Sequence, residues 1–151
     1  MVGLPFRPGV FMDVVIRLRR ADFDAMVAHA LEDAPLECCG IVAEKDGTSA
    51  GTHRATNVEE SPFRFSIDPR EYLRLEKEIE GDCNSVAGFY HSHTGTRAIP
   101  SPTDIRAMMG AGFTPPFVHF VIGVAEPDSP EVRAWHIVDG DRSEQDYELL
   151  D

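Results

Sequence analysis

The chain has 151 residues, and its hydrophobic content of 42% is typical of one folded domain with a core of its own. Its formal net charge is −12, with 26 acidic against 14 basic residues, which opposes binding to the phosphates of nucleic acids. No apolar run approaches the ~20 residues of a membrane span, and the N-terminus lacks the residue order of a secretory signal. We therefore expect a cytoplasmic protein that binds neither nucleic acid nor membrane.

The first part of the chain predicts an arm, a strand and a helix. Two prolines and two glycines without a clear period predict an irregular arm over residues 1–12, which leaves room for a homodimer. One domain over 13–151 follows. The β-branched run 13–18 predicts a first strand, and apolar residues at helical spacing predict a helix over 21–33. Pro35 is expected to end this helix.

The rest of the chain predicts further strands and two helices. The Asp46-Gly47 turn favours a hairpin, and Asp68-Pro69 and Ser101-Pro102 both have the form of a helix start. The acidic C-terminal residues are expected to be frayed. Together these elements predict a single α/β (α+β) domain with a central mixed β-sheet flanked by helices. The expected elements are strands over 38–43, 49–55, 63–67, 86–90, 117–124 and 132–138, a helix from Asp68 to Gly81 with a stripe of Tyr72, Leu75 and Ile79, and a helix from Ser101.

The most informative stretch is His91-Ser92-His93, followed after seven residues by Ser101-Pro102-Thr103-Asp104. Side chains two apart on a strand point to the same face, so both histidines can aim at one point. Asp104 lies one turn into the helix that Ser101 opens and can join them. Two imidazoles and a carboxylate suit zinc, and three protein ligands leave a fourth position free for water. The alternative is that all three are ordinary polar residues of a surface loop beside an N-cap serine, since His-x-His alone is a weak motif.

With the upstream Glu37, this pattern resembles the JAMM motif of the JAB/MPN metallopeptidases. The resemblance covers roughly residues 13–138 and is most specific at the motif. It extends to three further stretches, namely Pro35-Leu36-Glu37-Cys38-Cys39-Gly40, Asn57…Ser61-Pro62…Phe65-x-Ile67-Asp68-Pro69, and Gly88-x-Tyr90-His91-Ser92-His93. These stretches are similar to those of small stand-alone prokaryotic members.

The resemblance implies a cytidine-deaminase-like architecture and one zinc ion per chain. It implies that His91, His93 and Asp104 are the metal ligands. Glu37 would be the general acid/base that acts on the attacking water, and Ser101 would stabilise the oxyanion. All five positions hold the expected residue type. By itself, however, Glu37 would equally fit a solvated residue after a helix.

The resemblance further implies hydrolysis of a peptide or isopeptide bond at the C-terminal tail of a ubiquitin-like or sulfur-carrier protein ending in Gly-Gly. An extended tail could add a strand beside a sheet edge. The alternative is a non-catalytic binding or scaffold module, as some MPN domains are, although the complete motif disfavours it. A zinc nucleobase deaminase would need His-x-Glu and Pro-Cys-x-x-Cys, which do not occur here.

The remaining cysteines and histidines have simpler interpretations. The three cysteines form no CxxC pair, which argues against a disulfide framework. Cys38 and Cys39 are adjacent on an expected strand and point to opposite faces, so we expect buried apolar roles for them. His119 lies within an expected strand and is interpreted as a packed histidine, and Trp135 as a core residue. His29, His53 and His136 have no partners at recognisable spacing.

Overall fold

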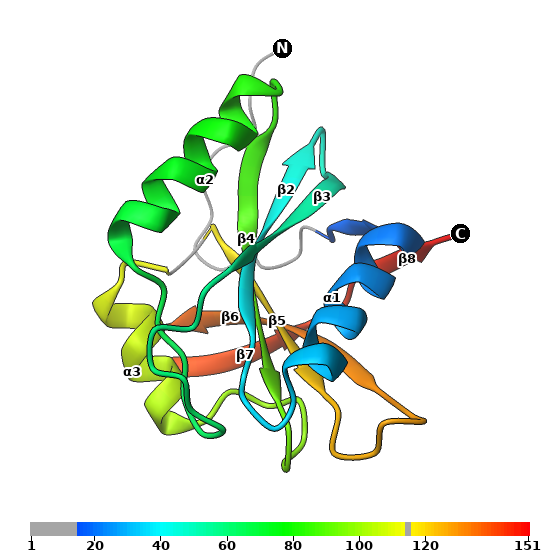
Figure 1. Ribbon diagram of the computed structural model, residues 1–151. Coiled ribbons are helices and arrows are strands. Elements are labelled where there is room, and N and C mark those ends of the chain that lie inside the picture. Colours follow the sequence, from blue (N-terminus) through cyan, green and yellow to red (C-terminus); the bar gives the residue numbers. More distant parts are fainter. Residues whose placement is uncertain (1–14, 114–115) are drawn as a thin grey trace.

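The computed structural model describes residues 15–113 and 116–151 (Figure 1). In this part of the chain, eight strands form one sheet and three helices pack beside it. The helices are α1 (Arg20–Asp33), α2 (Pro69–Gly81) and α3 (Pro102–Gly110). The strands are β1 (Arg17–Arg19), β2 (Cys39–Lys45), β3 (Thr48–Ala55), β4 (Ser85–His93), β5 (Val118–Gly123), β6 (Glu131–Val138), β7 (Asp141–Gln145) and β8 (Glu148–Leu150).

The sheet is mixed, with the strand order β7-β6-β5-β4-β2-β3-β1-β8. The central strand β4 pairs in parallel with β5 and antiparallel with β2. Helix α1 lies on one side of the sheet, whereas α2 and α3 lie on the other (Figure 1). The predicted α/β (α+β) domain with a mixed sheet flanked by helices is therefore confirmed. None of the helices in residues 15–113 and 116–151 is long and apolar enough to cross a bilayer.

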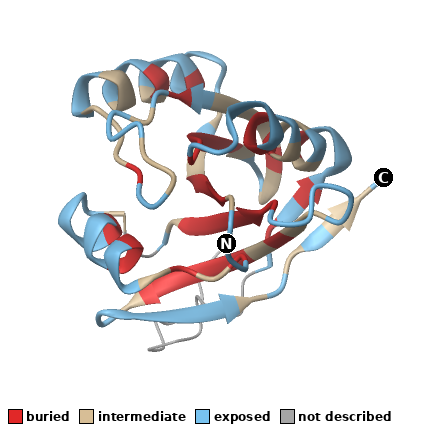
Figure 2. Cartoon of the chain, turned by 60° about the horizontal axis from the view of Figure 1, so that its bottom comes forward, coloured by how far each residue is buried: buried red, intermediate tan, exposed pale blue. Residues whose placement is uncertain are grey.

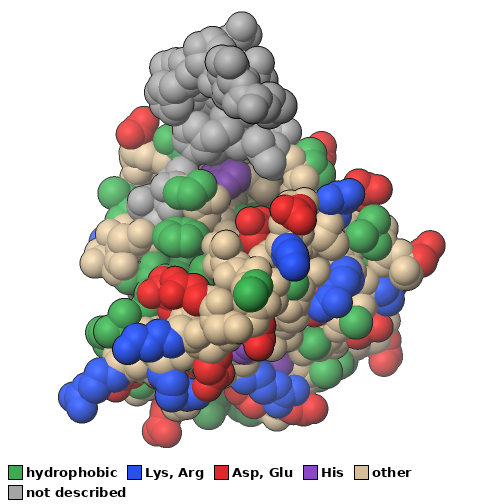
Figure 3. Space-filling model, turned by 90° about the horizontal axis from the view of Figure 1, so that it is seen from above, with side chains coloured by type: hydrophobic (Ala, Val, Ile, Leu, Met, Phe, Trp, Pro, Cys, Tyr) green, Lys and Arg blue, Asp and Glu red, His purple; other side chains and the backbone are tan. Residues whose placement is uncertain are grey.

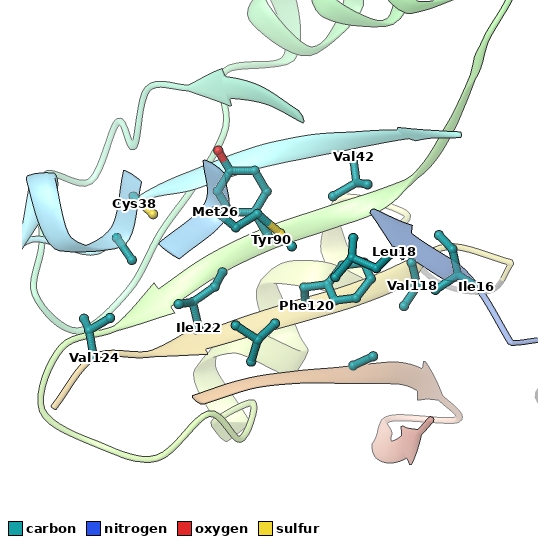
Figure 4. Packing of buried hydrophobic residues seen from close by; sticks show 13 residues of the cluster. Ile16, Leu18, Met26, Cys38, Val42, Tyr90, Val118, Phe120, Ile122 and Val124 are labelled. Atoms are coloured by element: carbon teal, nitrogen blue, oxygen red, sulfur yellow. The ribbon is translucent and has the colours of Figure 1, made fainter. Parts of the chain in front are cut away.

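The two faces of the sheet carry separate hydrophobic cores, because successive side chains of a strand alternate between faces. On the α1 face, Met26 and Ala30 pack with Tyr90 and Phe120, in the cluster that Figure 4 shows. On the opposite face, Phe89 packs with residues of α2 and α3. The outer faces of the helices are exposed, and the buried residues concentrate in the strands (Figure 2).

A glycine sets the close approach of β4 to β5. A Cβ atom at Gly88 would lie 1.8 Å from the carbonyl oxygen of Val118, so no larger residue fits without moving the backbone. The parallel pairing that Gly88 permits continues to the end of β4, where His91 pairs with Val121 and His93 with Gly123. This pairing fixes the direction of the strand end that carries both histidines.

Most of the predicted elements are found within a few residues of their expected bounds. The helix predicted over 21–33 is α1, and the one predicted from Asp68 to Gly81 is α2, where the Asp68 side chain accepts a hydrogen bond from the backbone N–H of Arg70. The hairpin around Asp46-Gly47 is formed by β2 and β3. The strands predicted over 86–90, 117–124 and 132–138 correspond to β4, β5 and β6.

Three predictions of secondary structure are wrong. The first strand spans only Arg17–Arg19 instead of 13–18, and residues 13–14 lie outside the described residues, as does the predicted arm over 1–12. Residues 63–67 form no strand, because the Asn57 side chain binds the backbone of Arg64 and Ser66 and takes the place of a partner strand.

The third error concerns the C-terminal residues, which are not frayed. They form β7, which pairs with β6, and β8, which pairs with β1. Their polar composition, which suggested fraying, suits strands at the edges of a sheet, where charged side chains remain in solvent. A bidentate ion pair between Arg133 and Glu144 joins β6 to β7, with both N–O distances at 2.7 Å.

Candidate metal centre

The end of β4 and the start of α3 bring two imidazoles and a carboxylate together. His91 and His93 leave β4 on the same face, and the helix N-terminus places Asp104 opposite them. The Nε2 atoms of His91 and His93 lie 3.3 Å apart, and Oδ2 of Asp104 lies 3.1 Å from the first and 2.9 Å from the second. All three side chains are buried. Among the described residues, this is the group of His, Cys, Asp and Glu whose ligand atoms converge as a metal site requires.

The distances between these atoms fit a tetrahedral ion. Zinc bonds of about 2.0–2.1 Å place neighbouring ligand atoms about 3.3 Å apart. The spacings of 2.9 to 3.3 Å are close to this value. In addition, Oδ1 of Asp104 is buried without a hydrogen-bond partner. A buried carboxylate oxygen without a partner is costly in a folded protein, and a cation would relieve this cost.

The tautomer of His93 gives a second argument for a cation. Its Nδ1 lies 2.7 Å from the carbonyl oxygen of Arg97, and a carbonyl can only accept, so Nδ1 carries the proton. In the neutral ring, Nε2 then has a lone pair that faces the carboxylate oxygen of Asp104. Two lone pairs at 2.9 Å repel each other unless a proton or a metal ion lies between them. The residues therefore fit a metal ion bound through both Nε2 atoms and Asp104.

The pKa values of the three side chains are set by their burial and by these short contacts. Burial alone would raise the pKa of Asp104, but His91, His93 and the backbone N–H of Ser101 hold this pKa well below its ordinary value. Burial lowers the pKa of His91 against the opposing effect of Asp104. Burial also acts to lower the pKa of His93, but its bonds to Asp104 and Arg97 outweigh this effect and raise it. Asp104 therefore stays ionised, as a metal ligand must.

Glu37 lies beside this group, in the segment between α1 and β2. The residue is only 3% exposed, and Oε1 is buried without a hydrogen-bond partner. Burial, together with the nearby charge of Asp104, raises the pKa of Glu37 to about 7, although His93 acts in the opposite direction. The backbone of Glu37 is held by the carbonyl of Ser61 and by the side chain of Asn57, at 2.9 and 3.0 Å. The sequence alternative of a solvated glutamate is thus wrong.

Ser101 caps α3 and shapes the position of Asp104. Its Oγ accepts from the backbone N–H of Asp104 at 3.0 Å, and Oδ2 of Asp104 accepts in return from the backbone N–H of Ser101 at 2.9 Å. This reciprocal arrangement is a capping box, and it confirms the predicted helix start. Because Oγ acts here as an acceptor, the hydroxyl proton is still available to another acceptor.

Sequence reasoning missed several side chains that build the centre. Ser92, which lies between the two histidines on β4, accepts with its Oγ from the backbone N–H of Cys38 at 2.8 Å. This bond joins the histidine strand to the residue after Glu37. The Phe65 ring stacks on His91, with centroids 4.2 Å apart. Only the alternation of β4 could have indicated the role of Ser92, since a residue between two ligands on a strand must face the other side.

A groove lies on one side of this centre. It has a volume of about 420 Å³ and lies between the segment that follows β3 and helix α3. Phe65 and Asp104 both line it. The groove therefore borders the centre on the side of Asp104.

Cys38, Cys39, His119 and Trp135 are placed as expected, whereas His29 does have partners, the Tyr90 hydroxyl at 2.7 Å and the Asp33 carboxylate at 3.2 Å. Cys38 and Cys39 are buried free cysteines that belong to the cores on opposite faces of the sheet. His119 is buried and lies in hydrogen-bond contact with the carbonyl of Phe113. Trp135 is buried and donates from Nε1 to the carbonyl of Ala98 at 3.0 Å.

On the face that Figure 3 shows, basic side chains are interspersed with acidic ones.

Comparison with known proteins identifies the family. Residues 19–138 match the model of the prokaryotic homologs of the JAB domain, so the chain belongs to this family. A CysO-cysteine peptidase of Mycobacterium tuberculosis is 34% identical over 142 residues, which cover 91% of this chain and 94% of the relative. A probable TtuB-protein conjugate cleaving protease of Thermus thermophilus is 32% identical over 100 residues, covering 66% and 67%. The predicted membership of the JAB/MPN group of small prokaryotic peptidases is confirmed.

Solved structures agree with this assignment. A protein of Desulfitobacterium hafniense has a TM-score of 0.81 at 30% identity, and the match covers 91% of this chain and 94% of that one. A JAB1/MPN domain protein of Archaeoglobus fulgidus has a TM-score of 0.59 at 12% identity, with coverage of 90% and 97%. The second likeness shows a shared fold. The predicted JAB/MPN architecture is therefore confirmed.

Proposed function

We propose that this protein is a zinc-dependent peptidase or isopeptidase that cleaves at the C-terminal tail of a ubiquitin-like or sulfur-carrier protein. The observation that carries the proposal is the convergence of three buried ligand atoms beside a buried glutamate whose Oε1 has no partner. His91, His93 and Asp104 would hold one zinc ion per chain. When bound, zinc lowers the pKa of water and polarises the scissile carbonyl.

Glu37 is the proposed general acid/base. A carboxyl group with a pKa near the working pH can both take a proton from water and return it to the leaving amine. Burial places the pKa of Glu37 at about 7 in the metal-free protein, and the charge of a bound ion would lower it. The backbone bonds from Ser61 and Asn57 fix the position of the carboxyl group.

Ser101 is the proposed donor to the carbonyl oxygen as negative charge develops on it. Its Oγ is held at the helix N-terminus by the backbone N–H of Asp104, and its proton is free to be donated. The first turn of α3 also presents backbone N–H groups and the positive end of a helix dipole, which favour a developing anion. Removing one such donor typically costs about 10²–10³ in kcat.

The substrate class is supported by the relatives. One is named a CysO-cysteine peptidase, and another a probable TtuB-protein conjugate cleaving protease. The first name describes cleavage between CysO and cysteine, and the second describes cleavage of a TtuB-protein conjugate. We propose a carrier with a Gly-Gly tail, because a groove beside a buried centre admits an extended chain of small residues more readily than bulky ones. We also propose a cytoplasmic location, since reducing conditions suit the three free cysteines.

The test uses Glu37→Gln, which keeps the size of the side chain. Purified wild-type protein and the variant should each hold about one zinc per chain. The variant should cleave a carrier extended by one residue beyond its Gly-Gly end at least ~100-fold more slowly, because the general acid/base is lost. Mass spectrometry of the carrier measures the cleavage.

Glu44→Gln is the matched control. Glu44 is also a glutamate whose pKa burial raises, but it lies at the far end of β2. Its variant should cleave at the wild-type rate. Full activity of Glu37→Gln would refute the proposed role of Glu37. Wild-type protein that holds zinc but cleaves no extended carrier would favour the alternative, a non-catalytic binding module of the MPN type.

A further inference from the structure

The loop between the proposed ligands His93 and Asp104 is held by side chains from β6 and β7. Trp135 donates from Nε1 to the carbonyl of Ala98 at 3.0 Å, and Arg142 donates to the carbonyl of Pro100 at 2.8 Å. Glu131 contacts the same loop, where its Oε1 accepts from the backbone N–H of Ala98 at 2.9 Å. The loop is therefore anchored to the sheet rather than only tethered by its two ends.

One peptide group of this loop joins Glu131 to His93. The carbonyl of Arg97 accepts the Nδ1 proton of His93 at 2.7 Å. The N–H of the same peptide group, which belongs to Ala98, donates to Glu131. The chain of contacts thus runs from the glutamate carboxylate through one peptide group to the imidazole. Hydrogen bonds in such a chain polarise one another, so a carboxylate at one end strengthens the acceptor at the other.

We propose that Glu131 is a positioning residue that acts on His93 through the Arg97–Ala98 peptide group, sets its ring orientation and increases the basicity of its Nε2. Metal-binding histidines commonly donate their other ring N–H to a carboxylate or a carbonyl, and this contact tunes the ligand. In this protein His93 donates to the carbonyl of Arg97, and the carboxylate of Glu131 accepts from the N–H of the same peptide group. The inference rests on the proposed function only in taking His93 as a ligand.

The environment of Glu131 favours the charged form that this role needs. The Arg97 side chain lies 2.7 Å from Oε2, and Glu131 is about one-third exposed, at 32%. The bond from Arg97, together with that from the backbone of Ala98, lowers the pKa of Glu131 below its ordinary value. Glu131 is therefore a carboxylate at neutral pH, and its two oxygens are divided between the Arg97 side chain and the backbone N–H that leads to His93.

The test measures zinc affinity and a proton resonance, both of which are independent of cleavage. In Glu131→Ala, zinc affinity measured by competition with a chromogenic chelator should fall on the order of tenfold, since loss of such outer partners costs about 10–100-fold. Glu131→Gln keeps an oxygen that can accept from Ala98, so its loss should be smaller. The ¹H NMR resonance of the His93 Nδ1 proton should move upfield in both variants as its hydrogen bond weakens.

Glu144→Gln is the matched control, because Glu144 lies on the same hairpin but its carboxylate accepts from Arg133 rather than from the backbone N–H of Ala98. Its zinc affinity and resonance should equal those of the wild type. If both Glu131 variants also match the wild type in affinity and in the His93 resonance, the inference is overturned. If instead His93→Ala binds zinc as tightly as the wild type, the metal site itself is wrong, which is a separate failure.

Discussion

At the scale of single residues, Glu37 occupies a position that favours its neutral form. Glu37 is 3% exposed, and its carboxyl group has an oxygen without a partner and lies near the charge of Asp104. A residue placed only for stability would have its polar atoms hydrogen-bonded, so the oxygen without a partner indicates a functional demand on this position. Ser92 has the opposite character, since its Oγ is satisfied by a hydrogen bond from the backbone N–H of Cys38, the residue after Glu37.

The raised pKa of Glu37 has a consequence for stability that can be measured without zinc. Its value of about 7 in the folded protein exceeds the ordinary 4.5, so the folded state holds the proton more tightly than the unfolded state. The resulting stability is fully present below about pH 4.5 and is lost as the pH rises to about 7. In metal-free protein, Glu37→Gln should therefore increase the free energy of unfolding at pH 8 by on the order of 2 kcal/mol more than at pH 5. Urea denaturation at the two pH values measures this difference.

Comparing the same variant at two pH values cancels any change in packing that the amide itself causes. Equal effects of Glu37→Gln at pH 5 and pH 8 would mean that the carboxyl titrates normally in the folded protein. The proposed matching of its pKa to the reaction would then be unsupported.

At the scale of elements, α2 and α3 begin in nearly the same way but serve different purposes. Asp68 caps α2 by accepting from Arg70, and Ser101 caps α3 by accepting from Asp104. Both helices have a proline just after the cap. The cap of α3 also orients a proposed metal ligand and carries the proposed oxyanion donor, whereas the cap of α2 holds only the helix end.

This difference predicts distinct results for two similar variants. Ser101→Ala and Asp68→Ala should each cost about 1 kcal/mol of stability, the usual effect of losing an N-cap side chain. Ser101→Ala should also reduce kcat about 10²–10³-fold, because a donor to the developing oxyanion is removed. Asp68→Ala should leave kcat unchanged. Thermal denaturation and cleavage assays on both variants measure these effects. If Ser101→Ala cleaves the carrier as fast as Asp68→Ala, Ser101 is not the donor.

At the scale of the whole molecule, metal binding should stabilise the entire fold. The proposed ligands lie on the central strand β4 and on α3, so unfolding either element abolishes the site. A ligand that binds only the folded state adds about 2.7 kcal/mol at a free concentration 100 times its dissociation constant. For a domain of this size, that corresponds to a rise in Tm of about 5–10 °C. Scanning calorimetry with added zinc and with a chelator should show this rise in the wild type.

The control for this effect is His93→Ala, in which one imidazole ligand is missing. Its Tm should respond much less to zinc than that of the wild type. An equal response would place the stabilising ion somewhere other than between His91, His93 and Asp104.

The local parts of this protein could be derived from its sequence. His91, His93, Ser101 and Asp104 lie close together in the chain, and a strand end followed by a helix start is enough to bring them together. Helical spacing predicted α1 and α2, and the turn at Asp46-Gly47 predicted the hairpin. These features depend on contacts between near neighbours in the chain. There the spacing of apolar residues and the identity of turn residues strongly indicate the local structure.

Only the tertiary structure decided the distant contacts. Without the family resemblance, Glu37 could equally have been a solvated residue, and only the fold shows it buried beside the candidate metal centre. The next residue, Cys38, is held there by a bond to Ser92, 54 residues further along the chain. The residues over 63–67 alternate like a strand, but the side chain of Asn57 binds their backbone instead. The acidic C-terminal segment became β7, from which Arg142 reaches the loop between the ligands. The sequence determined which groups could bind a metal ion. Burial and pairing over long separations decided which residues surround these groups, because desolvation and partner geometry exist only in the folded chain.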